Sequence, residues 1–312
     1  MSVAIRKPEA GDAGAVADIL NALGRELYGG ADVTEVEVSR WWEDPKVEAW
    51  VAVEDGRILS YADLGVHHEG TRLWIDLRRG AGGEEELLRT AEARACELAR
   101  PDSVLRTVAA APDDIARGIF ERNGYRTIRH SFHMSIDVTG DLPEPEWPDG
   151  IRVRTHVRDD DDECVYEADQ EAFEDHWDHV RTPYDEWRFY SVGRHDFDPT
   201  LWFLAEEGGE VSGISLCAKH FAGDPGVGRV ATLAVRRPWR RRGLGLALLH
   251  HSFRELKRRG FDEVRLEVDG ENLTGAVRLY ERAGMHVSRR YDTFEKSLRR
   301  ERALSGGSPT SV

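Results

Sequence analysis

The sequence repeats itself at an offset of 160 residues, and no other feature limits the fold as strongly. The aligned pairs, found without a gap, are Leu73 with Leu233, Ile75 with Val235, Leu88 with Leu248, Val104 with Val264, Val108 with Val268, Glu121 with Glu281 and Gly124 with Gly284. Around both members of each pair, strand-like and helix-like segments follow one another in the same order. Two tandem copies of one fold explain this pattern.

The boundaries of the two copies follow from length and composition. A chain of 312 residues is long for one domain and comfortable for two, each with its own core. Residues 139–150 hold three prolines and two glycines among mostly acidic side chains, and we interpret them as a linker. We therefore expect domains at 1–138 and 151–298, followed by a flexible tail at 299–312.

Periodicity and turn residues predict the secondary structure of each copy. The expected helices cover residues around 16–23, then 35–42, 84–98, 113–123, 162–173 and 184–190. The expected strands cover 49–53, 59–66, 73–77, 104–109, 131–138, 202–206, 211–220, 230–235 and 262–268. This mixture of strands and helices predicts an α+β protein.

The segment from Arg229 to Gly245 carries the strongest signal for chemistry. A β-rich run ends before Pro238, and residues 240–245 (RRRGLG) then lead into a helix with apolar residues at helical spacing. The first N–H groups of a helix lack internal partners, and the helix dipole favours an anion there. Glycines let an anion approach the backbone, and arginines add charge-assisted hydrogen bonds. Residues 240–245, called the arginine–glycine loop below, are therefore predicted to bind a diphosphate; on these six residues alone, a plain turn with solvated arginines is the alternative.

The first copy differs at the matching positions. Gly80 stands in place of Arg240 and Glu85 in place of Gly245, and two further glutamates flank Glu85. Carboxylates on a first helical turn satisfy the helix dipole themselves and repel a phosphate. We therefore expect the first copy to be degenerate. A slightly shifted alignment, with residues 79–82 (RGAG) as the loop, gives the opposite prediction of a second working site.

Composition excludes several classes of protein. The net charge is −15, whereas proteins that bind nucleic acids present a basic face. The sequence has neither an apolar run long enough to cross a bilayer nor a signal-peptide pattern, so we expect a cytoplasmic protein that binds no membrane. Its three cysteines are far apart, which argues against disulfides and zinc ribbons. His176 and His179 stand among carboxylates, but no third ligand is evident, and we predict no metal.

The elements after the loop complete a larger pattern. Beyond the helix and the strand at 262–268, residues 272–284 read NLTGAVRLYERAG. The order of strand, Arg-x-x-Gly-x-Gly, helix, strand and Asn-x3-Ala-x2-Leu-Tyr-Glu-x2-Gly resembles the Gcn5-related N-acetyltransferase (GNAT) superfamily. The resemblance implies an α/β/α sandwich in each copy, with a mixed, mostly antiparallel central sheet flanked by helices. It also implies that the diphosphate is that of acetyl-CoA, a cosubstrate bound by the second copy.

The resemblance assigns roles to individual residues. In this superfamily a central strand separates from its neighbour and leaves N–H groups free for the acyl carbonyl, and a tyrosine, here Tyr280, often protonates the departing thiolate. The residues expected to bind acetyl-CoA are Leu233, Ala234, Val235, Arg240, Arg241, Arg242, Gly243, Leu244, Gly245, Asn272 and Ala276. A structural role is the alternative for Tyr280, which can pack its helix on the sheet, and for Asn272, which can cap a helix.

Groups that handle the acceptor are less clearly marked. Glu267 alternates with Leu266 and Val268 on a strand beside the loop, and it is a candidate catalytic base acting through water. We expect His220 and His176 to contact the acceptor, because histidine titrates near neutral pH and because the segment after the first helix covers the acceptor site in this superfamily. Water alone can also deprotonate an amine, which would remove the need for a dedicated base.

The tandem layout resembles the mycothiol synthase-like two-domain acetyltransferases. Mycothiol synthases place an acidic residue where this chain has Arg229, so we expect a broader function. That function is transfer of an acetyl group to a primary amine of a small molecule by direct attack, in a monomer or homodimer. Acetylation of desacetylmycothiol is one alternative, and a non-catalytic, coenzyme A-binding regulatory protein is another. The intact loop argues against a pure interaction protein.

Overall fold

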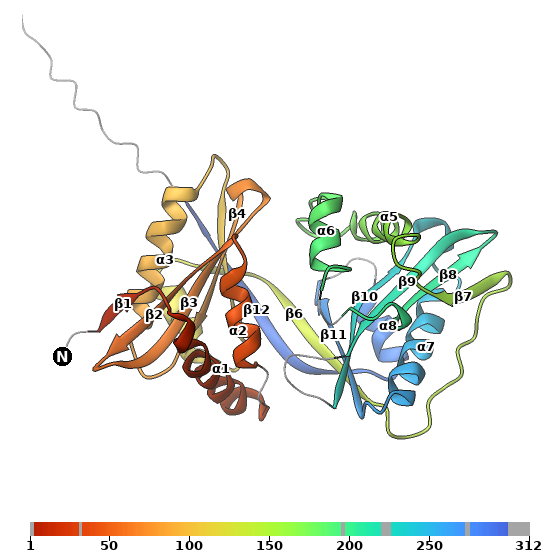
Figure 1. Cartoon of the computed structure of the whole chain (residues 1–312), viewed down its shortest axis with the longest axis horizontal. Helices are drawn as coiled ribbons and strands as arrows, with labels where there is room; N and C mark the ends of the chain where they lie inside the picture. Colours follow the sequence, from red (N-terminus) through yellow and green to blue (C-terminus); the bar gives the residue numbers. More distant parts are fainter. Residues whose placement is uncertain (1–2, 31–32, 195–196, 220–225, 272–274, 299–312) are drawn as a thin grey trace, which may run out of the picture.

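The computed structural model describes residues 3–30, 33–194, 197–219, 226–271 and 275–298 (Figure 1). The N-terminal half contains β1 (Ala4–Arg6), α1 (Ala13–Tyr28), α2 (Glu35–Glu43), β2 (Val47–Glu54), β3 (Arg57–His67), β4 (Arg72–Arg78), α3 (Glu84–Leu98), β5 (Val104–Ala110), α4 (Asp114–Arg122) and β6 (Arg126–Asp137). The C-terminal half contains β7 (Ile151–Thr155), α5 (Asp162–Phe173), α6 (Tyr184–Tyr190), β8 (Trp202–Glu207), β9 (Glu210–Ala218), β10 (Val227–Val235), α7 (Leu244–Arg258), β11 (Glu263–Asp269), α8 (Ala276–Arg282) and β12 (His286–Ser297). The predicted elements are confirmed, with shifts of a few residues at their ends.

The repeat of 160 residues is visible in the positions of the elements. α3 and α7 begin and end 160 residues apart, and so do β6 and β12. Both helices follow a glycine with a left-handed backbone, Gly83 (φ 83°) and Gly243 (φ 89°), a conformation that costs other residues about 1–2 kcal/mol. The glycine that precedes the helix is therefore shared by the two halves, whereas the residues before it differ: Arg241 has a positive φ (64°) in one half and Gly82 (138°) in the other.

The strands form one continuous sheet in the order β1-β2-β3-β4-β5-β12-β6-β11-β10-β9-β8-β7 (Figure 1). β4–β5 and β10–β11 are parallel pairs, and the other neighbours are antiparallel. The expected mixed, mostly antiparallel sheet is confirmed. In addition, the sheets of the two halves are joined into a single sheet of 12 strands.

The two halves exchange their last strands. β6, which ends the N-terminal half, pairs with β11, and β12, which ends the C-terminal half, pairs with β5. β6 and β12 also pair with each other and cross between the halves in the middle of the molecule (Figure 1). Each half therefore has its sheet completed by the other, and a division into domains at residues 139–150 stays a prediction.

Helices cover both faces of the sheet in the C-terminal half (Figure 1). α7 packs in one core with Phe203 of β8, whereas α5 and α6 pack in another core with Trp202 and Leu204 of the same strand. Neighbouring residues of a strand point to opposite faces, which explains why one strand serves two cores. The central strand β10 lies between these cores, so groups from both faces can meet at it.

A short segment after α5 reaches across to the N-terminal half. The Asp178 carboxylate accepts hydrogen bonds from Arg72 at 2.8 Å and from Arg106. The guanidinium of Arg106 lies 4.3 Å from the ring centroid of Trp177, and that of Arg129 lies 5.0 Å from it. We call this contact the Trp177–Asp178 clamp. It ties the segment that follows α5 to strands β4, β5 and β6.

Candidate active site

The parallel pair of β10 and β11 separates part of the way along. Its register covers only residues 227–229 against 263–265, although both strands continue for several residues. β10 stays paired with β9 as far as Val235, with an irregularity between Val230 and Thr232. From Val230 onward, the edge of β10 that faces β11 has no strand partner in the described part of the chain. This separation is the feature that the family resemblance implies for the central strand.

The ladder with β9 determines which N–H groups point to the open edge of β10. The N–H of Arg236 donates to the carbonyl of Ser212 at 3.0 Å, which continues the register of β10 against β9. Residues of an antiparallel strand face their partner alternately. Ala234 therefore also faces β9, whereas Leu233 and Val235 direct their N–H groups to the open edge. These two N–H groups are available to a carbonyl oxygen.

The arginine–glycine loop follows β10 after a 3₁₀ turn (Arg237–Trp239) and begins α7. Arg241 (φ 64°) and Gly243 (φ 89°) are both left-handed. Among the described residues, no group accepts a hydrogen bond from the backbone N–H groups of residues 241–245. Successive N–H groups in such a turn form an anion-binding nest, and the dipole of α7 reinforces it. A left-handed arginine is strained, and strain of this kind is concentrated at functional sites.

The three arginines of the loop have different partners. Arg240 lies 2.9 Å from Asp175, and Arg242 lies 2.6 Å from Glu207. Hydrogen bonds from Arg242 and a neighbouring indole lower the pKa of Glu207 to about 2, so this pair stays ionised near neutral pH. Arg241 is exposed and has no such partner in the described ranges. Arg241 is thus the loop arginine available to a phosphate, while the other two hold the loop in place.

The matching turn of the N-terminal half is closed by its own residues. The N–H of Gly80 donates to Glu84 Oε1 at 3.0 Å, and the N–H of Ala81 donates to the Leu59 carbonyl at 2.8 Å. A Cβ added to Gly80 would lie only 1.9 Å from the Leu59 oxygen. Arg79, the arginine of the shifted alignment, pairs with two carboxylates. Of the N–H groups that match those of residues 241–245, the one of Ala81 is therefore already bound, and three glutamates occupy the first turn of α3.

Tyr280 lies on α8, beside the start of α7. A Cβ added to Gly245 would lie 3.1 Å from Leu279 Cδ2 and 3.7 Å from Val235 Cγ2, so α7, α8 and β10 converge here. The Tyr280 side chain is 8% exposed, and its hydroxyl has no hydrogen-bond partner in the described part of the chain. Burial raises the pKa of this phenol to about 12. A phenol that keeps its proton can donate it to a thiolate.

The other predicted site residues lie in different surroundings. Glu267 is half exposed and lies 3.2 Å from Arg229, so a guanidinium already neutralises its charge. His176 is partly buried, which lowers its pKa, and Asp269 of β11 is the strongest opposing neighbour. Ala276 is the first residue of α8. The predicted residues His220 and Asn272 lie outside the described residues.

A cavity of about 250 Å³ lies on the face covered by α5 and α6, against β9 and β10. Its wall includes Asp169, which the sequence analysis did not identify. The sequence did contain a signal for this residue. Asp169 is four residues after Val165 and three before Ala172, so it shares a helix face with these two buried residues. A carboxylate on the buried face of a helix is rare unless it has a partner or a function.

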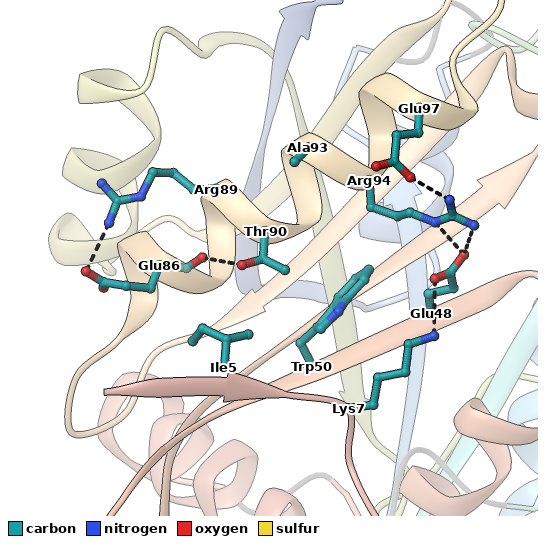
Figure 2. Close-up of a pocket in the computed structure, with 10 residues that line it drawn as sticks. All are labelled: Ile5, Lys7, Glu48, Trp50, Glu86, Arg89, Thr90, Ala93, Arg94 and Glu97. Atoms are coloured by element: carbon teal, nitrogen blue, oxygen red, sulfur yellow. Dashed lines mark hydrogen bonds and ion pairs between the residues drawn. The ribbon is translucent and has the colours of Figure 1, made fainter. Parts of the chain in front are cut away.

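A wider hollow of about 680 Å³ lies in the N-terminal half, between α3 and strands β1 and β2 (Figure 2). Its charged residues bind one another: Arg94 lies 2.7 Å from Glu48 and from Glu97, and Lys7 lies 3.4 Å from Glu48. None of the residues predicted for the site lines it. Because its charges are already paired, we assign no ligand to this hollow.

The described residues contain no group of three or more His, Cys, Asp or Glu side chains placed to hold a metal ion. No helix in these ranges combines the length and the apolar character needed to cross a bilayer. The three cysteines are free.

Comparisons with known sequences find acetyltransferases. Residues 163–285 match the model of the acetyltransferase (GNAT) family. A mycothiol acetyltransferase from Nocardia farcinica is 30% identical over 287 residues, which is 87% of this chain and 90% of that protein. Other mycothiol acetyltransferases are 32–34% identical, but the match spans only 54–55% of their own length.

Solved structures share the fold of the whole chain. A GCN5-related N-acetyltransferase from Sphaerobacter thermophilus is 33% identical, with a TM-score of 0.82 and 98% of both chains covered. A tandem GNAT protein from the clavulanic acid biosynthesis pathway is 17% identical, with a TM-score of 0.75 and coverage of 96% of this chain and 100% of that one. At 17% identity, the second similarity concerns the fold alone.

Proposed function

The chain belongs to the acetyltransferase (GNAT) family, and from this premise we propose that its C-terminal half transfers an acetyl group from acetyl-CoA to a primary amine of a small molecule. One observation carries the proposal. The N–H groups of residues 241–245 have no acceptor among the described residues and no carboxylate stands on the first turn of α7, whereas in the N-terminal half the Leu59 carbonyl binds the N–H of Ala81 and three glutamates occupy the first turn of α3. The diphosphate of acetyl-CoA, the acetyl donor of this family, is an anion that such a nest binds. We infer one active half and one supporting half.

The residues around β10 have separate roles in acyl transfer. The arginine–glycine loop and the side chain of Arg241 hold the diphosphate at the N-terminus of α7. The N–H groups of Leu233 and Val235 donate to the acyl carbonyl oxygen and stabilise the negative charge that develops on it. Tyr280 gives its proton to the departing thiolate. This arrangement keeps the thioester carbon beside the open edge of β10.

The remaining predicted residues complete the proposal. Asn272 and Ala276 line the coenzyme beside α8, and His176 and His220 contact the acceptor. Glu267 is the base candidate from the sequence, acting through water. Its ion pair with Arg229 also makes it a group that positions this arginine beside the acceptor.

Desacetylmycothiol is the acceptor that we propose first. It offers a primary amine, and the relative from Nocardia farcinica, named for this chemistry, matches over 90% of its length. A different small primary amine is the second candidate. Arg229 favours this second candidate, because mycothiol synthases place an acidic residue at that position.

Calorimetry and mass spectrometry together test the function. Titration with acetyl-CoA is expected to give one site per chain, and incubation with acetyl-CoA and desacetylmycothiol is expected to give the N-acetylated product. Two sites per chain would contradict the closed turn in the N-terminal half. Binding without product would exclude this acceptor and lead to a screen of other primary amines. Absence of binding would overturn the proposal.

A further inference from the structure

The cavity on the face of α5 and α6 adjoins the part of β10 where acyl transfer is proposed. Its wall includes Ala231 and Thr232 of β10, which directly precede Leu233, together with Arg229. The register between β9 and β10 is irregular at the same place, between Val230 and Thr232. A group bound in the cavity would therefore lie next to the N–H groups assigned to the acyl carbonyl.

One carboxylate in the cavity wall is held in a defined position. Gln170 Nε2 donates to Asp169 Oδ2 at 2.9 Å, and the indole N–H of Trp187 donates to the same carboxylate. The Gln170 amide is itself oriented, because its oxygen accepts a hydrogen bond from the N–H of Thr182 at 2.8 Å. A carboxylate can accept about four hydrogen bonds, so two donors leave room for a ligand. Burial raises the pKa of Asp169 to about 6.

The rest of the wall combines aromatic rings with two arginines. Trp187 on α6, Trp202 on β8 and Phe197 line the cavity, and so do Arg194 and Arg229, of which Arg229 forms an ion pair with Glu267. Aromatic faces attract cations, and a carboxylate forms a charge-assisted hydrogen bond with an ammonium group. Asp169 among these rings can therefore hold a primary ammonium group by a charge-assisted hydrogen bond.

We propose that this cavity binds the primary ammonium group of the acceptor, and that Asp169 holds the group and takes a proton from it. The proposal rests on the proposed function and names the acceptor subsite of the same reaction. One N–H bond of the ammonium breaks, and an O–H bond forms on Asp169, which leaves a neutral amine. The amine nitrogen then bonds to the acyl carbon, the carbon–sulfur bond breaks, and Tyr280 protonates the thiolate. The second proton of the nitrogen returns to the tyrosinate, and the proton on Asp169 leaves to solvent.

The pH dependence follows from the groups that surround Asp169. The other titratable or charged groups of the cavity wall are Tyr190 on α6, Arg194, Cys217 on β9 and Arg229 on β10. Burial raises the pKa of the Cys217 thiol to about 11, so this thiol stays neutral near pH 7, and burial is also the main cause that raises the pKa of Asp169. The rate should therefore rise with pH through about 6, as Asp169 loses its proton.

Kinetics of Asp169→Asn test the assignment, with acetyl-CoA and desacetylmycothiol as substrates. We expect kcat/KM to fall about 100-fold and the rise near pH 6 to disappear, while the affinity for acetyl-CoA stays unchanged. Glu167→Gln is the matched control, since Glu167 lies two residues away on α5, is exposed and pairs only with Arg181 among the described residues. This control should keep the wild-type rate. An Asp169→Asn enzyme within threefold of the wild type, or with its pH profile intact, would overturn the proposal.

A binding measurement keeps the test decisive if desacetylmycothiol is not acetylated. The indole N–H signal of Trp187, assigned with Trp187→Phe, is recorded by NMR while ethylammonium or, as an uncharged control, ethanol is added. The signal should move with ethylammonium in the wild type, not with ethanol, and not in Asp169→Asn. If the signal moves in this way but desacetylmycothiol is not acetylated, desacetylmycothiol is rejected as the acceptor and the ammonium subsite is retained. A signal unaffected by ethylammonium in the wild type would reject the subsite.

Discussion

The two halves of this molecule build corresponding turns before a helix and use them in opposite ways. In the C-terminal half, the N–H groups of residues 241–245 have no acceptor among the described residues, and Arg241 stands unpaired beside them in the same ranges. In the N-terminal half, the Leu59 carbonyl binds the N–H of Ala81, the counterpart of Arg241, and three glutamates occupy the first turn of α3. Both turns end in a left-handed glycine, Gly83 and Gly243, but the backbone before it differs, because Arg241 has a positive φ (64°) in one turn and Gly82 (138°) in the other. Side chains and the local backbone together therefore decide whether the turn can receive an anion.

The strongest test of this comparison converts the C-terminal turn into the N-terminal one. Gly245→Glu places a carboxylate on the first turn of α7, as Glu85 does on α3. Because like charges brought together cost several kcal/mol, we expect the affinity for acetyl-CoA to fall at least about 100-fold in calorimetry.

Gly245→Ala is the control for the added Cβ. That Cβ would lie 3.1 Å from Leu279 Cδ2, the mobile end of a side chain, so a small shift relieves it. We expect less than about a tenfold loss of affinity, since the cost of a small overpacking is about 1 kcal/mol. Equal losses for the two variants would mean that space, rather than charge, separates the halves.

A second test removes the proton donor that only the C-terminal half has. The N-terminal half has Phe120 where the C-terminal half has Tyr280. Tyr280→Phe should lower kcat about 100-fold, with little change in acetyl-CoA affinity or in the midpoint of urea unfolding, because the hydroxyl has no partner among the described residues.

The pH profile sharpens this second test. Burial raises the pKa of Tyr280 to about 12, so the phenol stays protonated from pH 6 to pH 10, and the substitution should lower the rate evenly over that range. A loss of activity confined to one end of the range, or an unchanged kcat, would contradict the assignment of Tyr280 as the acid.

A third test asks what the N-terminal half still contributes. Arg106→Ala removes a nearly buried arginine from the Trp177–Asp178 clamp and leaves Asp178 with one arginine fewer. We expect the free energy of unfolding to fall by about 3 kcal/mol and the KM for the acceptor to rise severalfold, with acetyl-CoA affinity unchanged. Arg89→Ala is the control: Arg89 is exposed, pairs with Glu86, and should cost less than about 1 kcal/mol.

The pH dependence of the clamp can be stated with its sign. Burial alone would raise the pKa of Asp178, but hydrogen bonds from Arg72 and Arg106 outweigh it and lower the pKa below the usual value. The ionised clamp therefore stabilises the fold above about pH 4 and loses this contribution as the pH falls through the lowered pKa. The difference in stability between the wild type and Arg106→Ala should shrink in the same range. A difference that stays constant to pH 2 would exclude the ionic contribution.

The local structure was predictable because its causes are local. α3, α5 and α6 begin and end where periodicity and capping predict, and the closed turn of the N-terminal half follows from its glutamates. The separate roles of Arg240, Arg241 and Arg242 could not be predicted from the sequence. Two of these arginines pair with Asp175 and Glu207, which come from segments distant in the sequence. Which arginine stays unpaired depends on the tertiary structure.

The exchange of strands was not predictable for a related reason. β6 and β12 occupy equivalent positions in the repeat, so each fits beside β5 or β11 equally well by its pattern of residues. A repeat reveals that two copies exist but conceals which copy a strand joins. Asp169 was missed because its burial depends on α6 and on β10, which are distant from it in sequence.

The exchange of strands also has a consequence for how the protein is made. β5 pairs with β4 on one side and with β12 on the other, so this second edge of β5 stays open on the ribosome until almost the whole chain has been synthesised. Contacts between residues so far apart slow folding and leave an exposed edge for chaperones to protect. The exchange also restrains evolution after a gene duplication. A copy that has lost its ligand cannot be deleted without taking away a strand that its active partner needs.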